Sequence, residues 1–527
     1  MKRVLVSDSM ASEVVEILNS APGIKCDVKT GMKPEELKAV IKDYDALIVR
    51  SSTKATAEII EAATKLAAIG RAGAGVDNID IPAASKRGIV VMNTPGGNTV
   101  TTGEHAIAMM LALARRIPQA TASMKAGKWE KSKFMGNEYC NKTLGIIGLG
   151  RVGSIVADRA QGLKMNVLAH DPFIAPEVAA KMGIPLVTLD EIYASADFIT
   201  VHPALSKETK NLIDANALAK MKKGVFIINC ARGGIVNEKA LYDALVSGKV
   251  AGAAIDVFEE EPTKNMELIS LDNVICTPHL GASTDEAQTS VAIAIAHQIA
   301  AYFATGEIKG AVNFPSVSAE LMAVIRPYLD LAEKLGKLQA QLLTGAIQEV
   351  NIEYNGEILN YNVAPVTISL IKGLLEPILN ENVNYINAPV IAKERGIKVV
   401  ESKSTEIKDY TSMITLNVKT SKETSVTAGA LFGKHDPRIV RINEFSVEII
   451  PEGHMLAVSN DDRPGVIGNL GTTLADNKVN IARLHLSRDP QAKHALVVLN
   501  TDSAVPETVL EKLRKLPHVI SIKPIKM

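Results

Sequence analysis

Three loops of the sequence carry side chains suited to carbonyl and alcohol chemistry, and each loop follows a run of residues typical of a β-strand. Arg232 lies in the first loop, the consecutive residues Glu259, Glu260 and Glu261 in the second, and His279 in the third. An imidazole can take the proton of a hydroxyl group, and an arginine can bind a carboxylate through two parallel hydrogen bonds. A neighbouring carboxylate raises the pKa of an imidazole. The three loops therefore predict an acid–base site, and their spacing does not select one of the three glutamates.

The elements that must position these loops alternate between strands and helices over the first 315 residues. The runs with strand character include 4–6, 47–49, 89–92, 143–147, 166–169, 198–201, 225–229, 252–256 and 273–276. Apolar strands separated by helical segments are typical of parallel sheets covered by helices on both faces. Two such sheets are needed to use all the strands. Ligands bind beyond the carboxyl ends of the strands in these sheets, where the three loops would meet.

Gly148, Gly150 and Gly153 form a G-x-G-x-x-G pattern between a strand and a helix. In that context the glycines allow a tight turn, close approach of a pyrophosphate and close helix packing. Asp171 ends the next strand, at the spacing of the acidic residue that accepts hydrogen bonds from ribose hydroxyls. A carboxylate there repels a 2′-phosphate, and no lysine or arginine lies between Asp171 and Lys181. We expect NAD rather than NADP; a turn cap is the alternative role of Asp171.

Composition and charge exclude several classes of function. The 58 Lys and Arg residues balance 58 Asp and Glu residues, which argues against a nucleic-acid or membrane-surface role. The longest apolar stretch, 106–114, is too short to cross a bilayer. Four scattered cysteines show no C-x-x-C spacing, so we expect no metal site. A soluble protein in the reducing cytoplasm fits these observations.

The pattern changes after residue 315. A long helix is predicted from residue 320 to about 344, and residues 316–450 have the character of an α+β domain. From residue 453 the order of elements is strand, helix, strand, strand, helix, strand, which predicts a ferredoxin-like domain. The predicted fold class is α/β: two Rossmann-like parallel-sheet domains, then an α+β domain and a ferredoxin-like domain.

Several of these segments resemble the signature segments of the D-2-hydroxyacid dehydrogenases. They are R-A-G-A-G-V-D-N-I-D at 71–80, the glycine loop at 148–153, A-R-G-G at 231–234, E-P at 261–262 and P-H-L-G at 278–281. The resemblance implies that Arg232 binds substrate, that Glu261 pairs with His279, and that His279 is the acid–base. It also implies a substrate domain at 1–97 and 286–315 around an NAD-binding domain at 98–285, with a crossing helix at 104–116.

The same resemblance implies the residues that contact the dinucleotide. They are Ala74, Gly148, Gly150, Arg151, Val152, Gly153, Asp171, Pro203, Cys230, Ala231, Arg232, Asp256, His279, Leu280, Gly281 and Ala282. One position departs from the family pattern, because His202 is followed directly by Pro203. The contact of Pro203 is then steric, and His202 is expected to be structural.

The segments 50–54 and 93–99 are most similar to the branch of the family that acts on 3-phosphoglycerate. Arg50, Arg71, Asn98 and Arg232 are the expected substrate contacts, since a substrate with two anionic groups needs more than one cation. The alternative for Arg50 is a surface ion pair. The implied reaction is oxidation of D-3-phosphoglycerate to 3-phosphohydroxypyruvate with NAD, the first committed step of L-serine biosynthesis.

The last domain resembles an ACT domain, a module that binds small amino-acid effectors, and residues 316–450 would be the intervening domain of the long forms. We expect L-serine, the end product of the pathway, to bind between paired ACT-like domains and to inhibit the enzyme. In a fold with this order of elements, Asn460, Asp462 and Asn480 can meet at one sheet edge. The resemblance also implies a homotetramer. The alternative is that this domain only joins subunits.

Two other functions compete with this interpretation. A dehydrogenase for another D-2-hydroxy acid, such as glycerate or lactate, is disfavoured by the ACT-like domain. A non-catalytic NAD-sensing binding protein on the same core is disfavoured by the three intact catalytic loops.

Overall fold

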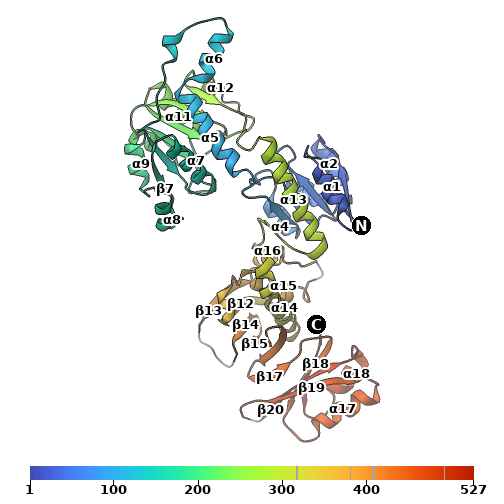
Figure 1. The fold of residues 1–527 in the computed structure, drawn as a ribbon. Helices are drawn as coiled ribbons and strands as arrows, with labels where there is room; N and C mark the ends of the chain where they lie inside the picture. The colour runs from blue at the N-terminus through green and yellow to red at the C-terminus, as the bar shows by residue number, and fades with distance from the viewer. Residues whose placement is uncertain (316–318, 380–381, 406–409, 492) are drawn as a thin grey trace.

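The computed structural model describes residues 1–315, 319–379, 382–405, 410–491 and 493–527. Four sheets follow one another along an extended molecule, and the two parallel sheets lie side by side at one end (Figure 1). The predicted fold class is confirmed: both N-terminal sheets are wholly parallel, the third is mixed and the fourth has the ferredoxin-like strand order. The predicted change of character at residue 316 falls on residues outside the described ranges.

The first sheet has the order β2-β1-β3-β4-β5. Its strands are β1 (Lys2–Val6), β2 (Ile24–Val28), β3 (Ala46–Val49), β4 (Ala68–Arg71) and β5 (Val90–Asn93). The helices around it are α1 (Glu13–Ser20), α2 (Pro34–Val40), η1 (Ile41–Asp43), α3 (Ala57–Ala62), α4 (Ile81–Lys86) and α13 (Asp285–Thr305). Sequence patterns missed β2 and β4. β2 is an edge strand in which Lys25 and Asp27 interrupt the apolar residues and only Ile24 is buried. β4 contains Gly70, which has low strand propensity.

Gly70 is explained by the return of the chain to this sheet. A Cβ atom on Gly70 would lie 2.7 Å from Ile295 of α13, so the helix packs directly on β4. Val291, Ile295 and Ile299 of α13 are buried in the core beneath the sheet. Asn313 then accepts a hydrogen bond from the Val91 amide, which attaches the segment after α13 to the edge strand β5.

The second sheet has the order β11-β10-β9-β8-β6-β7. Its strands are β6 (Thr143–Ile147), β7 (Asn166–His170), β8 (Phe198–Val201), β9 (Val225–Asn229), β10 (Val250–Ile255) and β11 (Val274–Cys276). Its helices are α5 (Thr99–Ala114), α6 (Ile117–Lys125), η2 (Lys131–Phe134), α7 (Arg151–Gly162), α8 (Pro176–Lys181), α9 (Leu189–Ser195), α10 (Ala215–Lys220), α11 (Glu238–Val246) and α12 (Met266–Ile269). The catalytic loops follow β9, β10 and β11, which are neighbours in the sheet, so their carboxyl ends meet as predicted.

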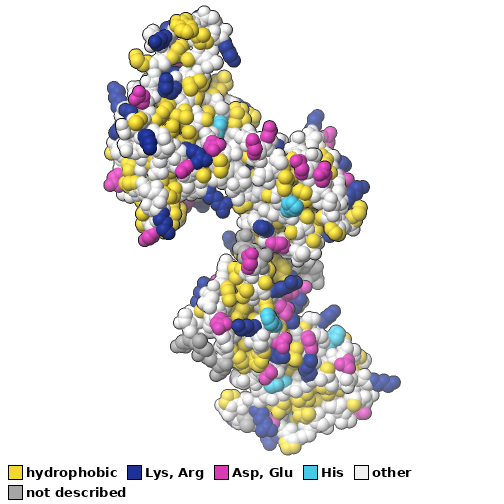
Figure 2. All heavy atoms as spheres, in the orientation of Figure 1, with side chains coloured by type: hydrophobic (Ala, Val, Ile, Leu, Met, Phe, Trp, Pro, Cys, Tyr) yellow, Lys and Arg dark blue, Asp and Glu magenta, His cyan; other side chains and the backbone are white. Residues whose placement is uncertain are grey.

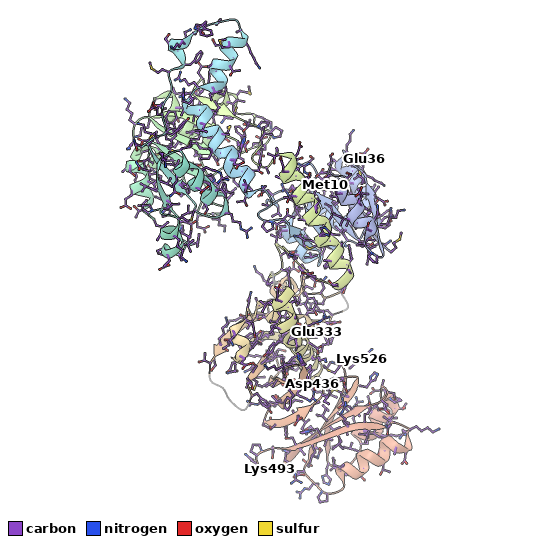
Figure 3. All side chains as sticks on the ribbon, in the orientation of Figure 1. Met10, Glu36, Glu333, Asp436, Lys493 and Lys526 are labelled. Carbon is purple, nitrogen blue, oxygen red and sulfur yellow. The ribbon has the colours of Figure 1, made fainter. Side chains whose placement is uncertain are left out.

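The third sheet has the order β13-β12-β14-β15-β16-β17, and one face packs on α14 and α15. Its elements are α14 (Ala319–Leu342), β12 (Ile347–Gly356), η3 (Glu357–Asn360), α15 (Ala364–Leu375), α16 (Ala388–Glu394), β13 (Lys398–Ser404), β14 (Ser412–Thr420), β15 (Thr424–Phe432), β16 (Asp436–Ile442) and β17 (Phe445–Ile449). Glu333 of α14, labelled in Figure 3, forms an ion pair of 2.6 Å with Lys372 of α15.

The fourth sheet has the order β19-β20-β18-β21. Its elements are β18 (His454–Asp461), α17 (Val466–Asp476), β19 (Ile481–Arg488), β20 (His494–Thr501), α18 (Glu507–Arg514) and β21 (Val519–Lys526). One face packs on α17 and α18 and the other on the third domain. Gln341 of α14 exchanges two hydrogen bonds with the backbone of Lys526, which lies at this contact (Figure 3).

Candidate active site

His279 and Glu261 form a hydrogen-bonded pair at the carboxyl end of the second sheet. The distance from His279 Nδ1 to Glu261 Oε2 is 2.8 Å. Glu259 instead accepts from the Glu238 amide, and Glu260 pairs with Lys264, so only Glu261 of the three glutamates faces the imidazole. The hydrogen bond to Glu261 raises the pKa of His279 against the opposing effect of burial. The geometry suits a proton acceptor and donor, because Glu261 binds Nδ1 and Nε2 is the ring atom that can exchange a proton.

Arg232 lies beside this pair, in the loop after β9. Its Nε atom is 3.2 Å from the carboxylate of Asp77, which belongs to the first parallel-sheet domain. Asp77 is 78% exposed, so the ion pair is screened by water and easily exchanged for another anion. Arg232 is therefore placed to bind a substrate carboxylate at the junction of the two domains.

A cavity of about 250 Å³ brings the expected substrate residues next to the catalytic pair. Its lining includes Arg50, Arg71, Asn98, Glu261 and His279. A second cavity of about 870 Å³ shares Arg71, Glu261 and His279 with the first. Residues from both parallel-sheet domains line each cavity, so the site lies between the domains.

Arg71 is the unusual member of this group. Its Nε atom is buried without a hydrogen-bond partner, and its Nη1 atom donates only to the neighbouring Ala72 carbonyl, at 3.2 Å. Burial lowers the pKa of Arg71, and repulsion from Arg232 lowers it further. A guanidinium that is partly desolvated and left without a carboxylate is matched to an anionic ligand.

The glycine loop has the geometry that a dinucleotide requires. Gly148 has φ of 94°, and a Cβ atom there would lie 2.9 Å from the Pro203 nitrogen. A Cβ atom on Gly153 would lie 2.1 Å from the Gly148 oxygen, so this residue permits close packing of α7. Nothing lies within 4 Å of a Cβ atom built on Gly150, so this side of the loop is open to a pyrophosphate.

Asp171 lies directly after β7 and contacts the glycine loop. One carboxylate oxygen accepts from the Leu149 amide at 2.8 Å and the other from the Phe173 amide at 2.8 Å. The turn cap and the ribose contact are therefore compatible, because each oxygen keeps a free lone pair. His202 follows β8 and is partly buried, and desolvation lowers its pKa to about 4.

The other expected dinucleotide residues surround the same edge. Arg151 and Val152 begin α7, Cys230 and Ala231 follow β9, and Asp256 follows β10. Asp256 accepts from the amides of Leu280 and Gly281 at 2.7 and 2.9 Å. Ala74 and Ala282 lie in loops at the domain junction.

The expected effector residues are not brought together within one chain. Asp462 lies at the end of β18 and pairs with Arg488 at the end of β19, at 2.9 Å. Asn480 precedes the start of β19 and donates to Asp502. β18 and β19 run in the same direction, and a strand rises about 3.3 Å per residue, so Asn480 and Asp462 lie about 25 Å apart or more. The expectation that they meet at one sheet edge is wrong for a single chain.

Sequence reasoning gave no role to several side chains of this site. Ser51, Lys54 and Gln288 line the cavities, and His105 of α5 contacts Asp256 at 3.3 Å. Ser51 and Lys54 lie in the segment 50–54, whose resemblance could have pointed to them, whereas Gln288 and His105 lie in no motif and only the fold brings them to the site.

Among the described residues, no helix is both long and apolar enough to cross a membrane.

Family models cover three parts of the chain. Residues 107–281 match the NAD binding domain of the D-isomer specific 2-hydroxyacid dehydrogenases. Residues 324–443 match the D-3-phosphoglycerate dehydrogenase intervening domain, and residues 454–518 match the ACT domain. The second parallel sheet is therefore an NAD-binding domain.

Solved structures resemble the two N-terminal domains. A glyoxylate reductase from Paecilomyes thermophila superposes with a TM-score of 0.55 and 31% identity, over 59% of this chain and 98% of its own. D-lactate dehydrogenase from Aquifex aeolicus, complexed with NAD and lactic acid, superposes with a TM-score of 0.53 and 28% sequence identity. This match covers 60% of this chain and all of the D-lactate dehydrogenase chain.

Relatives named D-3-phosphoglycerate dehydrogenase match nearly the whole chain. The protein of Archaeoglobus fulgidus is 46% identical, with 98% of both chains covered. The Synechocystis protein is 44% identical, and the match covers all of this chain and 95% of the Synechocystis chain. The Bacillus subtilis protein is 40% identical, with 99% of both chains covered. With its NAD-binding, intervening and ACT domains in the same order, this chain belongs to the D-3-phosphoglycerate dehydrogenase family of NAD-dependent D-2-hydroxyacid dehydrogenases.

Proposed function

We propose that this enzyme oxidises D-3-phosphoglycerate to 3-phosphohydroxypyruvate with NAD. The observation that carries the proposal is the unpaired guanidinium of Arg71 beside His279, in a cavity that also presents Arg50 and Asn98. A substrate with a carboxylate and a phosphate can be held by Arg232 and Arg71 together. We assign the substrate domain to residues 1–97 and 286–315, the NAD-binding domain to 98–285, the intervening domain to 316–450 and the ACT domain to 453–527.

The residues of this chain supply orientation and proton transfer. Gly148, Gly150 and Gly153 would hold the pyrophosphate of NAD, and the bound cofactor would supply a hydride acceptor for the alcohol carbon. Arg232 binds the substrate carboxylate and polarises the adjacent C–O bond, while His279 takes the hydroxyl proton through Nε2. Glu261 stabilises the resulting imidazolium, since its carboxylate already lies 2.8 Å from Nδ1.

The substrate is tested by NADH formation with 3-phosphoglycerate, D-glycerate and D-lactate. We expect kcat/KM for D-glycerate to be lower by about 10³-fold or more, because a substrate without phosphate leaves a buried cation unpaired. Comparable rates for all three acids would favour a dehydrogenase of another D-2-hydroxy acid. NADH binding without turnover of any acid would identify a binding protein.

Cofactor choice is tested at Asp171. We expect kcat/KM with NAD to exceed that with NADP by about 10²-fold or more, because the carboxylate repels a 2′-phosphate at close range. Asp171→Ser should reduce this preference at least about tenfold. Glu177→Gln, an exposed carboxylate in the first turn of α8, is the matched control. Equal use of both cofactors by the wild type would contradict the assignment.

We also propose that L-serine binds between the ACT domains of two chains. β19 is an edge strand, and antiparallel pairing of two β19 strands would place the start of one beside the end of the other. Asn480 of one chain would then lie near Asp462 of the second. Leu484 and Leu486 are 45% and 39% exposed on the helix side of this edge, which supports a second chain as its cover.

In this arrangement Asp462 accepts from the ammonium group of serine and Asn480 donates to its carboxylate, with the α17 N-terminus nearby. Asn460 is 2% exposed and its Oδ1 atom is buried without a partner, so it is available for a ligand that reaches the loop. The site is far from His279, so inhibition requires that serine binds one conformation of the enzyme better than another.

Calorimetry on mixed variants tests a site between chains. Asp462→Ala and Asn480→Ala should each abolish serine binding, which we expect near millimolar or tighter in the wild type. After subunit exchange, a mixture of the two variants should recover binding, because one of the two sites in a hybrid pair has both residues intact. Absence of binding to the wild type would leave the ACT domain as a joining module only.

We also propose that the protein is a homotetramer, and two separate apolar surfaces on each chain support this proposal. The β19 edge is one. The other is the arm formed by α6 and η2, in which α6 has no buried residue and Trp129 and Met135 are 81% and 82% exposed. Figure 2 shows hydrophobic side chains at the end of this arm. Two distinct two-fold interfaces on one chain generate a closed tetramer, which light scattering of the full chain tests.

A further inference from the structure

The loop that carries His279 is held in a strained conformation by one buried carboxylate. His279 has φ of 57°, in the left-handed region that residues other than glycine seldom adopt. Asp256 is fully buried and accepts from the amides of Leu280 and Gly281. Its backbone oxygen also accepts from the His279 amide, at 2.9 Å. These bonds fix both sides of the strained residue.

The position of the Asp256 carboxylate in turn depends on two side chains. Thr277 donates its hydroxyl proton to Asp256 Oδ1 at 2.6 Å. His105 Nε2 lies 3.3 Å from the same oxygen and 3.2 Å from Thr277 Oγ1. Because the hydroxyl has only one proton to donate, Nε2 must carry a hydrogen that is shared between the two oxygens.

His105 reaches the loop from another element. It lies on α5, which leads from the domain junction into the second sheet (Figure 1), and it is 19% exposed in its side chain. At the start of α5, Thr101 Oγ1 lies 3.5 Å from Thr284 Oγ1 at the start of α13. We propose that His105 is a positioning residue, because through Asp256 it holds the His279 loop in register with α5. This inference rests on the proposed role of His279.

Cys230 also approaches this group, and the ligand atoms of His105, Cys230 and Asp256 lie within 4.8 Å of one another. Burial raises the pKa of Cys230, which keeps it a thiol. Burial alone would raise the pKa of Asp256 as well, but the hydrogen bonds from His105, Thr277 and Leu280 lower it. Both Asp256 oxygens already accept N–H or O–H groups, so the cluster is organised as a hydrogen-bond network rather than as a metal site.

Two substitutions test whether the N–H donor of His105, rather than the size of its side chain, is what positions the loop. His105→Leu removes the donor, whereas His105→Gln keeps an N–H group near the position of Nε2. In His105→Leu we expect kcat to fall about 10–100-fold, with KM for 3-phosphoglycerate changed less than about threefold, since the substrate cations lie elsewhere. His105→Gln should restore kcat to within about threefold of the wild type. Glu104→Gln, at the neighbouring exposed position of α5, is the control.

Amide hydrogen exchange, followed by mass spectrometry, gives a measurement that does not depend on turnover. In His105→Leu the peptide containing Leu280 and Gly281 should exchange about tenfold faster, while peptides of β6 and α7 are unchanged. Unchanged exchange in His105→Leu, or equal acceleration in His105→Leu and His105→Gln, would overturn the inference. A wild type inactive on 3-phosphoglycerate would refute the proposed substrate, and the exchange results would still decide the role of His105.

Discussion

His279→Ala is expected to lower kcat by about 10²–10⁴-fold and to leave NADH affinity nearly unchanged. No other imidazole contacts Glu261 among the described residues, and proton transfer by a positioned side chain contributes a factor of this size. Stopped-flow measurement of the hydride-transfer step separates this loss from slow product release. Near-normal hydride transfer in the variant would remove His279 from the mechanism.

Glu261→Gln tests the same pair through its pH dependence. The hydrogen bond to Glu261 raises the pKa of His279, so removing the charge should lower that pKa. Oxidation needs the neutral imidazole, and its rate rises with pH through the pKa of His279. The acid limb of the oxidation profile should therefore move to lower pH in the variant. Glu259→Gln, at a side chain that accepts from the Glu238 amide, should leave the profile unchanged.

Arg71→Met should raise KM for 3-phosphoglycerate by about 10²–10³-fold, because charge-assisted bonds to a desolvated anion are among the strongest polar contacts. The same substitution should leave the melting temperature unchanged or raise it, since it removes a charge whose Nε has no partner in the free enzyme. Opposite effects on affinity and stability distinguish a ligand-binding arginine from a structural one.

Arg50→Met provides the comparison for Arg71. The Arg50 side chain is exposed and already donates to the Ser9 carbonyl at 3.0 Å, so we expect a smaller rise in KM. Rates with D-glycerate identify the anion at Arg71. A defect that is confined to the phosphorylated substrate places the phosphate there, whereas an equal defect with both acids places the carboxylate there. A destabilised Arg71→Met variant with unchanged KM would contradict the proposed role.

Most of the fold follows from local sequence patterns, because the central strands are apolar and the turns carry glycine. The order of strands and helices in the ACT domain was predicted correctly, because each amphipathic segment is short and well separated. β4 was missed because it contains Gly70. A glycine is needed there because α13, more than two hundred residues later in the sequence, packs directly on this strand. Long-range contacts of this kind leave no local pattern.

The site residues also fall into two groups: those that local motifs predicted and those that only the fold brings together. Motifs predicted the glycine loop, Arg232 and His279, and the choice of Glu261 came from family resemblance until the loop geometry placed it beside His279. His105 carries no motif, and its role depends on the distance between a helix and a loop that only the fold defines. The distance between Asp462 and Asn480 could not be predicted from local patterns, because the strand directions place them at opposite ends of the sheet within one chain.

The return of α13 to the first sheet has a consequence for synthesis. Val291, Ile295 and Ile299 cover a face of the sheet built from the first 93 residues, yet they are translated after every strand of the second sheet. The elements of the second sheet are contiguous from α5 to β11, so this domain can fold on the ribosome as it emerges. The N-terminal sheet cannot be completed at that stage. The order of translation and the order of folding therefore differ. If the ribosome pauses before α13, the NAD-binding domain can already be folded, whereas the apolar face of the N-terminal sheet is still uncovered.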